Sequence, residues 1–229
     1  KVLGFKDYLI FCDSDMFRSF YLKELLQPKL FIYYTRDNLL SIKFWQTQGR
    51  RIEPILMSKS DLVLANSEYL KGIAARYNTN SYFVGQGCDL SLFSEKNIKE
   101  IPEDIARIPG PVIGYIGTLV TLRLDIGIIR YIALNKPDWN IVLVGPEDDG
   151  FLKSDLHDIK NICFLGSKKE SELPAYLSAF TVAINPQLMN ELTIGNYPRK
   201  IDEYLAMGKP VVATKTLAME YFQNHVSLA

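Results

Sequence analysis

This sequence contains few histidines and cysteines, and its net charge is zero. It contains two histidines in 229 residues, and its 26 basic side chains balance its 26 acidic ones. Proteins that bind nucleic acid through general electrostatic attraction carry a basic surplus, so this balance argues against that class. Neither His157 nor His225 has a matching acid at a telling distance in the sequence, and His157 is interpreted as a residue on a helix surface.

The three cysteines, Cys12, Cys88 and Cys163, share no metal-ligand spacing. Two of them lie in or beside apolar runs, which is typical of buried thiols in a reducing compartment. No apolar run approaches the ~20 residues of a membrane-spanning helix, and no secretory signal is visible. We therefore expect a cytoplasmic protein with no metal site.

What the sequence does contain is a series of short apolar runs that alternate with segments of helical period. Hydrophobic residues make up 48% of the chain, which allows a sizeable core. Apolar residues on both faces of a short run are typical of strands inside a parallel sheet. The runs lie at residues 8–12, 30–34, 62–66, 82–85, 112–117, 140–145, 161–166, 182–186 and 211–214. The helical segments include 15–26, 67–77, 123–134 and 169–180.

This alternation predicts an α/β protein with two Rossmann-like, doubly wound parallel sheets. A polar, proline-bounded stretch at residues 94–111 reads as a linker, so we place a first domain at 1–105 and a second at 106–229. The chain starts without methionine and stops soon after a strand. We therefore expect a fragment of a longer protein, with an incomplete first domain and a truncated second one.

Polar residues follow the strands of the predicted second domain. Ligands of such sheets bind beyond the carboxyl ends of the strands, so these residues are candidates for a site. They combine glycine, hydroxyl, amide and cation, which suits a phosphorylated ligand. The residues are Gly117, Thr118, Arg123, Pro146, Glu147, Ser167, Lys168, Lys169, Asn190, Thr193, Gly195 and Asn196.

The segment 195–214 predicts a short helix with a charged start. Pro198 suits a first helical turn, Asn196 a local cap and Gly208 the position after the helix. Lys200 and Glu203 share a face near the helix start, where an anion is favoured. This arrangement predicts a diphosphate beside Lys200 and a ribose on Glu203. The alternative is a surface ion pair between Glu203 and a cation four residues earlier.

Several segments together resemble the GT-B glycosyltransferases of the retaining family-four type. They are "DLVLANSEYL", "VGQGCDLSLF", "GPVIGYIGTL", "PDWNIVLVGP", "NICFLGSKKESELPAYLSAFTVAINP" and "PRKIDEYLAMGKPVVAT". The resemblance covers residues 62–214, and it implies two Rossmann-like domains with a cleft between them. It also implies transfer of a sugar from a nucleotide-diphosphate sugar to a saccharide or lipid-linked saccharide acceptor, without a metal or further cofactor.

The resemblance assigns roles to individual residues of the donor site. It implies that Glu203 holds the ribose and that Lys200 and Arg123 are the catalytic cations that reach the diphosphate. The remaining donor-binding residues would be Gly117 and Thr118 in the glycine turn, Ser167 and Lys168 at the base, and Asn196.

One position departs from the family's pattern. The family usually has a glutamate eight positions before Glu203, whereas this chain has Gly195. Either Glu191, Thr193 or Asn196 replaces that glutamate, or the donor sugar is held differently.

Other features of the first domain remain open. The motif Asp13-Ser14-Asp15 has the spacing of a metal site, and the alternative interpretation is a loop or a helix cap. Arg36 and Asp37 follow a strand and are candidates for the acceptor side. The alternative interpretation is that they form the start of a helix. The basic and aromatic stretch 17–31 allows a peripheral contact with the inner face of a membrane. The alternative is that its apolar side chains belong to the core and its charged side chains face solvent.

Two rival functions also fit the sequence. A nucleotide-sugar epimerase on the same fold would need acid and base residues across the cleft, and the two histidines are poorly placed for that role. A non-catalytic nucleotide- or sugar-binding module is favoured by Gly195.

Overall fold

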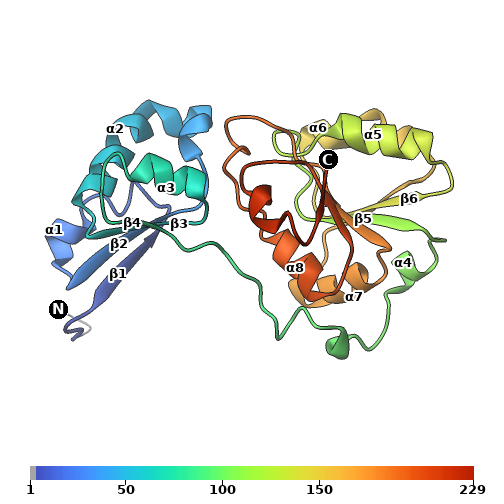
Figure 1. Cartoon of the computed structure of the whole chain (residues 1–229), viewed down its shortest axis with the longest axis horizontal. Helices are drawn as coiled ribbons and strands as arrows, with labels where there is room; N and C mark the ends of the chain where they lie inside the picture. The colour runs from blue at the N-terminus through green and yellow to red at the C-terminus, as the bar shows by residue number, and fades with distance from the viewer. Residues whose placement is uncertain (1–3) are drawn as a thin grey trace. The chain divides into compact units, whose positions relative to one another are not determined.

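The computed structural model describes residues 4–229, which form two compact units. The first unit contains residues up to Gln86 together with Asn190–Tyr197, and the second contains Gly87–Met189 and Pro198–Ala229. Each unit has one sheet in which every neighbouring pair of strands is parallel (Figure 1). The expected fold class, α/β with two Rossmann-like parallel sheets, is confirmed.

The first unit is a four-stranded sheet with its strands in sequence order. Its strands are β1 (Leu9–Asp13), β2 (Leu30–Thr35), β3 (Leu62–Ala65) and β4 (Ser81–Phe83). Its helices are α1 (Leu22–Leu26), η1 (Leu39–Ser41), α2 (Lys43–Lys59) and α3 (Glu68–Ala74). In Figure 1, α2 and α3 lie on one face of this sheet.

The helices of this unit differ from those predicted. Of the predicted helix at 15–26, only α1 is helical, because the backbone before it turns: Ser14 has φ 55°, and Arg18 N donates to Asp15 Oδ1 at 3.0 Å. The longest helix, α2, turns an unusual stripe toward the sheet. That stripe contains Gly49 and Glu53 beside Leu56 and Met57, which weakens its apolar periodicity in the sequence.

The second unit is a six-stranded sheet in the order β10-β9-β8-β5-β6-β7. Its strands are β5 (Val112–Ile116), β6 (Asn140–Val144), β7 (Ile162–Gly166), β8 (Val182–Asn185), β9 (Val211–Ala213) and β10 (Ser227–Leu228). Its α-helices are α4 (Glu103–Ala106), α5 (Ile126–Asn135), α6 (Asp149–Leu152), α7 (Leu173–Ser178) and α8 (Lys200–Ala206). Its short 3-10 helices are η2 (Glu95–Asn97), η3 (Asp155–Asp158), η4 (Glu170–Glu172) and η5 (Met219–Phe222). Figure 1 shows α5 and α6 on one face of this sheet and α7 and α8 on the other.

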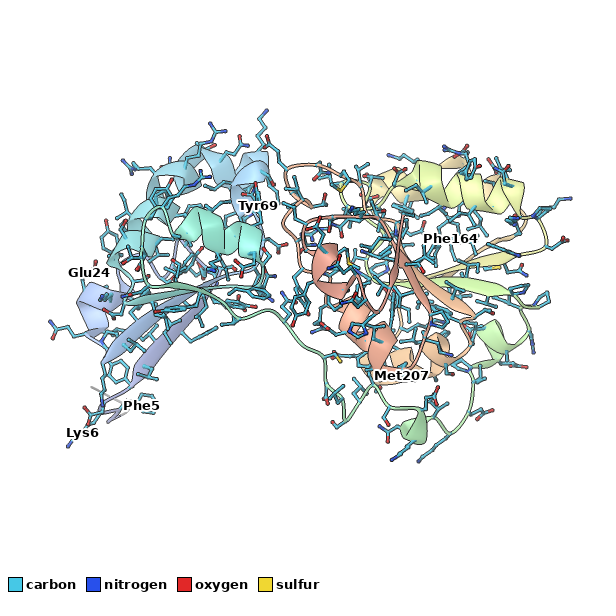
Figure 2. The ribbon with its side chains drawn as sticks, viewed as in Figure 1. Phe5, Lys6, Glu24, Tyr69, Phe164 and Met207 are labelled. Carbon is cyan, nitrogen blue, oxygen red and sulfur yellow. The ribbon has the colours of Figure 1, made fainter. Side chains whose placement is uncertain are left out.

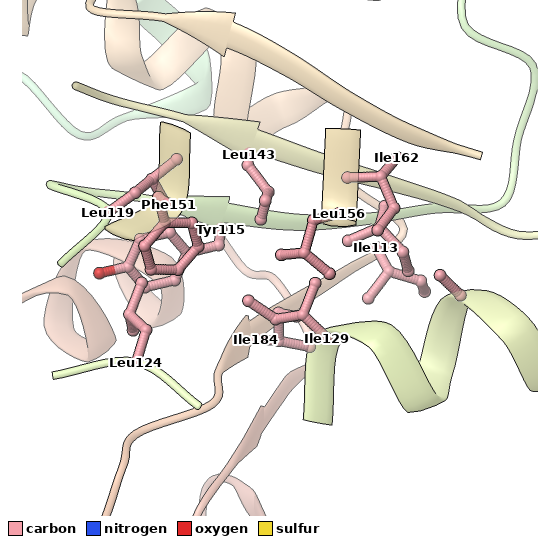
Figure 3. Close-up of a cluster of buried hydrophobic side chains, with 12 residues drawn as sticks. Ile113, Tyr115, Leu119, Leu124, Ile129, Leu143, Phe151, Leu156, Ile162 and Ile184 are labelled. Atoms are coloured by element: carbon pink, nitrogen blue, oxygen red, sulfur yellow. The ribbon is translucent and has the colours of Figure 1, made fainter. Parts of the chain in front are cut away.

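Apolar side chains fill the space between this sheet and α5 (Figure 3). Ile129 of α5 and Leu143 of β6 are both completely buried there. Burial of one such side chain stabilises the fold by roughly 1.5–3 kcal/mol, so this cluster holds the strand ends in place. Its labelled members are Ile113, Tyr115, Leu119, Leu124, Ile129, Leu143, Phe151, Leu156, Ile162 and Ile184.

The division between the units falls earlier than the boundary near residue 105 that the sequence predicts. The segment from Gly87 onward belongs to the second unit. Two apolar side chains explain this, because Phe93 is 4% exposed and Ile105 only 1%. The polar stretch therefore begins inside the second unit. Across residues 4–229, no helix is long and apolar enough to cross a bilayer.

A buried carboxyl group supports the first unit from within. Glu53 of α2 is 6% exposed, and the hydroxyl of the completely buried Tyr33 donates to its Oε1 at 2.8 Å. Burial raises the pKa of Glu53, although the hydrogen bond from Tyr33 acts in the opposite direction. The folded state therefore holds the Glu53 proton more tightly than the unfolded chain does.

We expect Glu53→Gln to flatten the pH dependence of the free energy of unfolding. The contribution of Glu53 is fully present below its ordinary pKa of 4.5 and is lost as the pH rises through the raised pKa of the folded state. Glutamine mimics the protonated acid and still accepts from Tyr33, so the variant should be the more stable protein at neutral pH. Urea denaturation between pH 4.5 and 8 measures this. The exposed Glu68→Gln is the control, and parallel curves for wild type and Glu53→Gln would contradict the expectation.

Candidate functional site

Two glycine turns end the central strands of the second unit. Gly117 follows β5 with φ 144°, and Gly145 follows β6 with φ 149°, which are conformations that side chains rarely adopt. A Cβ on Gly145 would lie 2.0 Å from the carbonyl oxygen of Gly117. The two turns therefore approach each other so closely that only glycine fits, and backbone rather than side chain is presented at the sheet edge.

A cavity of about 180 Å³ lies at this edge. It brings together four of the predicted donor-binding residues, Gly117, Thr118, Ser167 and Lys168, from the ends of β5 and β7. Its remaining lining is Ile116, Val144, Gly145, Pro146 and Leu173, so it combines an apolar floor with backbone polar groups. This composition suits a flat ring attached to a polar chain.

Lys200 lies directly beside the glycine turn of β5. Its ammonium is 5.1 Å from the centre of the Tyr115 ring, and its Cε is 3.2 Å from the point where a Cβ on Gly117 would lie. The helix that carries it is fixed by Tyr204, one turn further on. This completely buried residue accepts a hydrogen bond from the backbone N–H of Ile116 at 2.9 Å. A helix with an anchored backbone thus carries a lysine beside a turn that exposes backbone, which suits a phosphate group.

The start of α8 differs from the prediction. The helix begins at Lys200 and has seven residues, and its N-cap Arg199 makes no side-chain capping bond. Pro198 precedes the cap, and Asn196 lies further upstream, where its N–H donates to the carbonyl of Thr193. In so short a helix the contribution of the dipole is small, and the positive charge at this place comes from the side chains.

Glu203 forms the ion pair that the sequence offered as an alternative. Arg199 Nε lies 3.0 Å from Glu203 Oε1, and the Glu203 side chain is only 9% exposed. Burial raises the pKa of Glu203, and the cations Arg199 and Lys200 act against that rise. Glu203 lies one turn from Lys200 on α8, so its predicted contact with a ribose stays a prediction.

Lys168 lines the cavity, but its ammonium has a partner of its own. Its Nζ donates to Asp104 Oδ2 at 2.6 Å, and the Tyr176 hydroxyl donates to the same carboxylate at 3.0 Å. The predicted contact of Lys168 with a base therefore falls on its backbone rather than on its charge.

Arg123 lies in the turn between β5 and α5. Its N–H donates to the carbonyl of Val120 at 2.8 Å, and its own carbonyl accepts from the N–H of Leu188 at 2.9 Å. Its backbone is thus tied to the segment that follows β8, which places it at the same sheet edge as the cavity. Its contact with a diphosphate stays a prediction.

The predicted donor residue Asn196 belongs to the segment Asn190–Tyr197, which packs with the first unit. Gly195 in this segment touches Tyr69 of α3 (labelled in Figure 2), since a Cβ on Gly195 would lie 2.1 Å from Tyr69 Cδ1. Of the three residues considered as replacements for the expected glutamate, Thr193 is completely buried and accepts from the N–H of Asn190. Glu191 is exposed, and its carbonyl accepts from Asn38 Nδ2 at 3.0 Å.

The charged residues after the first strands of the first unit pair with one another. Arg36 Nε lies 2.7 Å from Asp13 Oδ1, and Asp15 accepts from the backbone of Arg18. Asp37 accepts through its carbonyl from the N–H of Leu39 as the chain enters η1. Within the described residues, no group of three or more histidine, cysteine, aspartate or glutamate side chains has an arrangement that could hold a metal ion.

One residue pair was missed in the sequence. His157 Nε2 lies 2.8 Å from Glu147 Oε2, and its ring stacks on Phe164 of β7 (labelled in Figure 2) with centroids 3.9 Å apart. The prediction that His157 has no matching acid is therefore wrong. The separation of ten residues hides this pair in the sequence, because only the fold brings the loop after β6 beside η3. Glu147 follows Pro146, which lines the cavity, so the pair lies next to one border of the cavity.

Comparisons with known proteins agree with this geometry. Residues 110–227 match the family described as Glycosyl transferases group 1. Over 191 residues the chain is 31% identical to a protein of Bacillus subtilis (strain 168) named "Putative teichuronic acid biosynthesis glycosyltransferase TuaH". The alignment covers 78% of this chain and 46% of that protein, so the chain spans about half the length of this relative.

Solved structures share the fold. Anabaena HepE in complex with UDP superimposes with a TM-score of 0.76 at 20% identity, over 97% of this chain and 64% of that one. An alpha,alpha-trehalose-phosphate synthase from Burkholderia vietnamiensis gives a TM-score of 0.75 at 10% identity, over 100% of this chain and 61% of that one. At these identities the likeness is one of fold.

We expect Gly145→Ala to destabilise the second unit by at least about 2 kcal/mol, because it adds both a strained backbone and a clash with the Gly117 carbonyl. Gly166→Ala is the matched control, since Gly166 has φ 67° but nothing within 4 Å of its Cβ position. That control should cost about 1 kcal/mol from the backbone alone. Chemical denaturation of both variants measures the difference, and equal losses would contradict the close approach of the two turns.

Proposed function

Because the chain belongs to the family of Glycosyl transferases group 1, we propose that it carries the donor site of an enzyme that moves a sugar from a nucleotide-diphosphate sugar to a saccharide acceptor. The observation that supports this most directly is the Lys200 side chain, which lies beside the Gly117 turn that lines the cavity and has its ammonium over the Tyr115 ring. A nucleotide has a flat base and an anionic diphosphate, and the cavity and the lysine offer one complementary feature for each.

The proposed chemistry is electrostatic. Departure of the nucleotide leaves negative charge on its β-phosphate, and the anomeric carbon becomes oxocarbenium-like. We assign stabilisation of that charge to Lys200 and Arg123, with transfer that retains the anomeric configuration and uses no cofactor. The anchored helix supports this role, because the hydrogen bond from the Ile116 N–H to buried Tyr204 fixes the backbone that carries Lys200 before the charge develops.

The acceptor side of the proposal rests on the first unit. Arg36 and Asp37 follow β2 at the carboxyl edge of that sheet, where hydrogen-bonding and charged groups suit the hydroxyls of a saccharide. In this proposal the acceptor can be a lipid-linked saccharide, with the enzyme acting at the inner face of a membrane. HepE has been solved with UDP and with UDP-glucose, so UDP is the first nucleotide to test.

We expect Lys200→Ala to weaken UDP binding to the 229-residue chain by about tenfold, which corresponds to about 1.4 kcal/mol. Isothermal titration with UDP, GDP and ADP measures the affinity and identifies the preferred base. Lys153→Ala is the control, since Lys153 is a cation of the same unit with a side chain that is 79% exposed. Equal affinities for wild type and Lys200→Ala would contradict the diphosphate site. Absence of saturable binding of all three nucleotides would overturn the proposed function.

We expect Glu203→Ala, which removes the acceptor oxygens, to remove the preference for ribose over deoxyribose. If Glu203 accepts from the ribose hydroxyls, wild type should bind UDP about tenfold more tightly than 2′-deoxy-UDP. The variant should bind the two nucleotides alike. Arg199→Ala separates this role from the ion pair, because it breaks the Arg199–Glu203 contact and keeps the carboxylate. A preference that survives in Glu203→Ala would leave Glu203 with the ion pair alone.

A further inference from the structure

A second group of charged residues borders the cavity, and the proposed function gives it no role. Lys168 Nζ donates to Asp104 Oδ2 at 2.6 Å and lies 4.9 Å from the centre of the Tyr176 ring. The Tyr176 hydroxyl lies 3.0 Å from both oxygens of Asp104. The three side chains come from α4, from the loop after β7 and from α7, so the network joins three elements of one unit.

Buried side chains hold this network in the second unit. Tyr176 is 4% exposed, and Ile105, the neighbour of Asp104, is 1% exposed. Burial alone would raise the pKa of Asp104, but the hydrogen bonds from Lys168 and Tyr176 outweigh it and hold that pKa below its usual value. Asp104 is therefore an anion at neutral pH with two donors on it, and charge-assisted hydrogen bonds of this kind are the stronger ones.

Backbone hydrogen bonds hold this loop at its two ends, since the Gly145 N–H donates to the Gly166 carbonyl at 3.0 Å and the Lys169 N–H donates to Glu172 Oε2 at 2.9 Å. Gly166 ends β7 with φ 67°, and nothing lies within 4 Å of its Cβ position. Ser167 is exposed, although it lines the cavity together with Lys168. Between these two ends, the Lys168 side chain anchors the cavity wall to Asp104 of α4 and Tyr176 of α7.

We propose that Asp104 is a positioning residue for the nucleotide base. By holding Lys168, it fixes the wall that Ser167 and Lys168 form at the end of β7, and that wall faces the flat ring of the nucleotide. This inference rests on the proposed function of the cavity. It gives the linker-like segment around α4 a part in recognition of the donor.

The test is titration of wild type and Asp104→Asn with UDP, GDP and ADP. Asparagine keeps the shape of the side chain and removes the charge that holds Lys168. The affinity for the preferred nucleotide should fall by about tenfold, because a wall displaced by a fraction of an ångström loses contact with the base. The ratio between the preferred nucleotide and the other two should shrink as well. A merely structural loss would weaken all three in equal proportion and leave that ratio unchanged.

The chain offers a closely matched control in its first unit. Lys23 Nζ and Asp61 Oδ1 are also 2.6 Å apart, and the Asp61 side chain is 37% exposed against 39% for Asp104. Asp61→Asn should therefore lose a comparable ion pair and keep wild-type nucleotide affinities and ratios. If Asp104→Asn does not fold, Tyr176→Phe replaces it, because it removes only the hydroxyl that donates to Asp104. We expect it to shrink the ratio between the preferred nucleotide and the other two in the same direction, by a smaller amount.

The outcomes separate the two proposals. If wild type binds none of the three nucleotides, the proposed function itself is overturned, and this inference falls with it. If wild type binds but Asp104→Asn keeps the same affinities and ratios, the positioning role alone is overturned. Equal losses in Asp104→Asn and Asp61→Asn, or a proportional loss for all three nucleotides, also overturn it.

Discussion

The close approach of Gly145 to the carbonyl of Gly117 is the constraint on which the second unit's site depends. The all-parallel sheet brings the ends of β5 and β6 together, and with 2.0 Å between a Cβ position and an oxygen there is no room for a side chain. The sheet edge therefore offers backbone groups and open space where most positions would offer side chains. The features that we assign to the donor surround that space: the cavity, the lysine beside it and the walls on either side.

Around this backbone edge, side chains act mainly by holding one another. Tyr204 fixes the helix that carries Lys200, Asp104 holds Lys168, and Glu147 holds His157. Among these groups, Lys200 lies beside the glycine turn, with its ammonium over the Tyr115 ring. A flexible loop could present the same charges, but each would then lose conformational entropy on binding. Here the order is already part of the fold.

The sequence predicts the sheets well and the pairings poorly, for a physical reason. A strand buried on both faces has an apolar signature in its own residues, and all nine predicted runs correspond to strands. The glycine turn and Lys200 also carry local signals. By contrast, Asp104–Lys168 and Glu147–His157 join residues far apart in the chain, and only the crossings of the fold bring them together. Helix α2 was hard to recognise because Gly49 and Glu53 interrupt its buried stripe.

The contact between Gly195 and Tyr69 constrains how this protein can change. A methyl group at position 195 would lie 2.1 Å from the tyrosine ring, so no side chain is accepted there while the ring stays in place. The two positions are far apart in the sequence but form one steric unit within the first compact body. A carboxylate at 195, which the family resemblance expects, is therefore accessible only along an ordered path in which Tyr69 is replaced by a smaller residue first. The same substitution at 195 would be harmful in one genetic background and acceptable in the other.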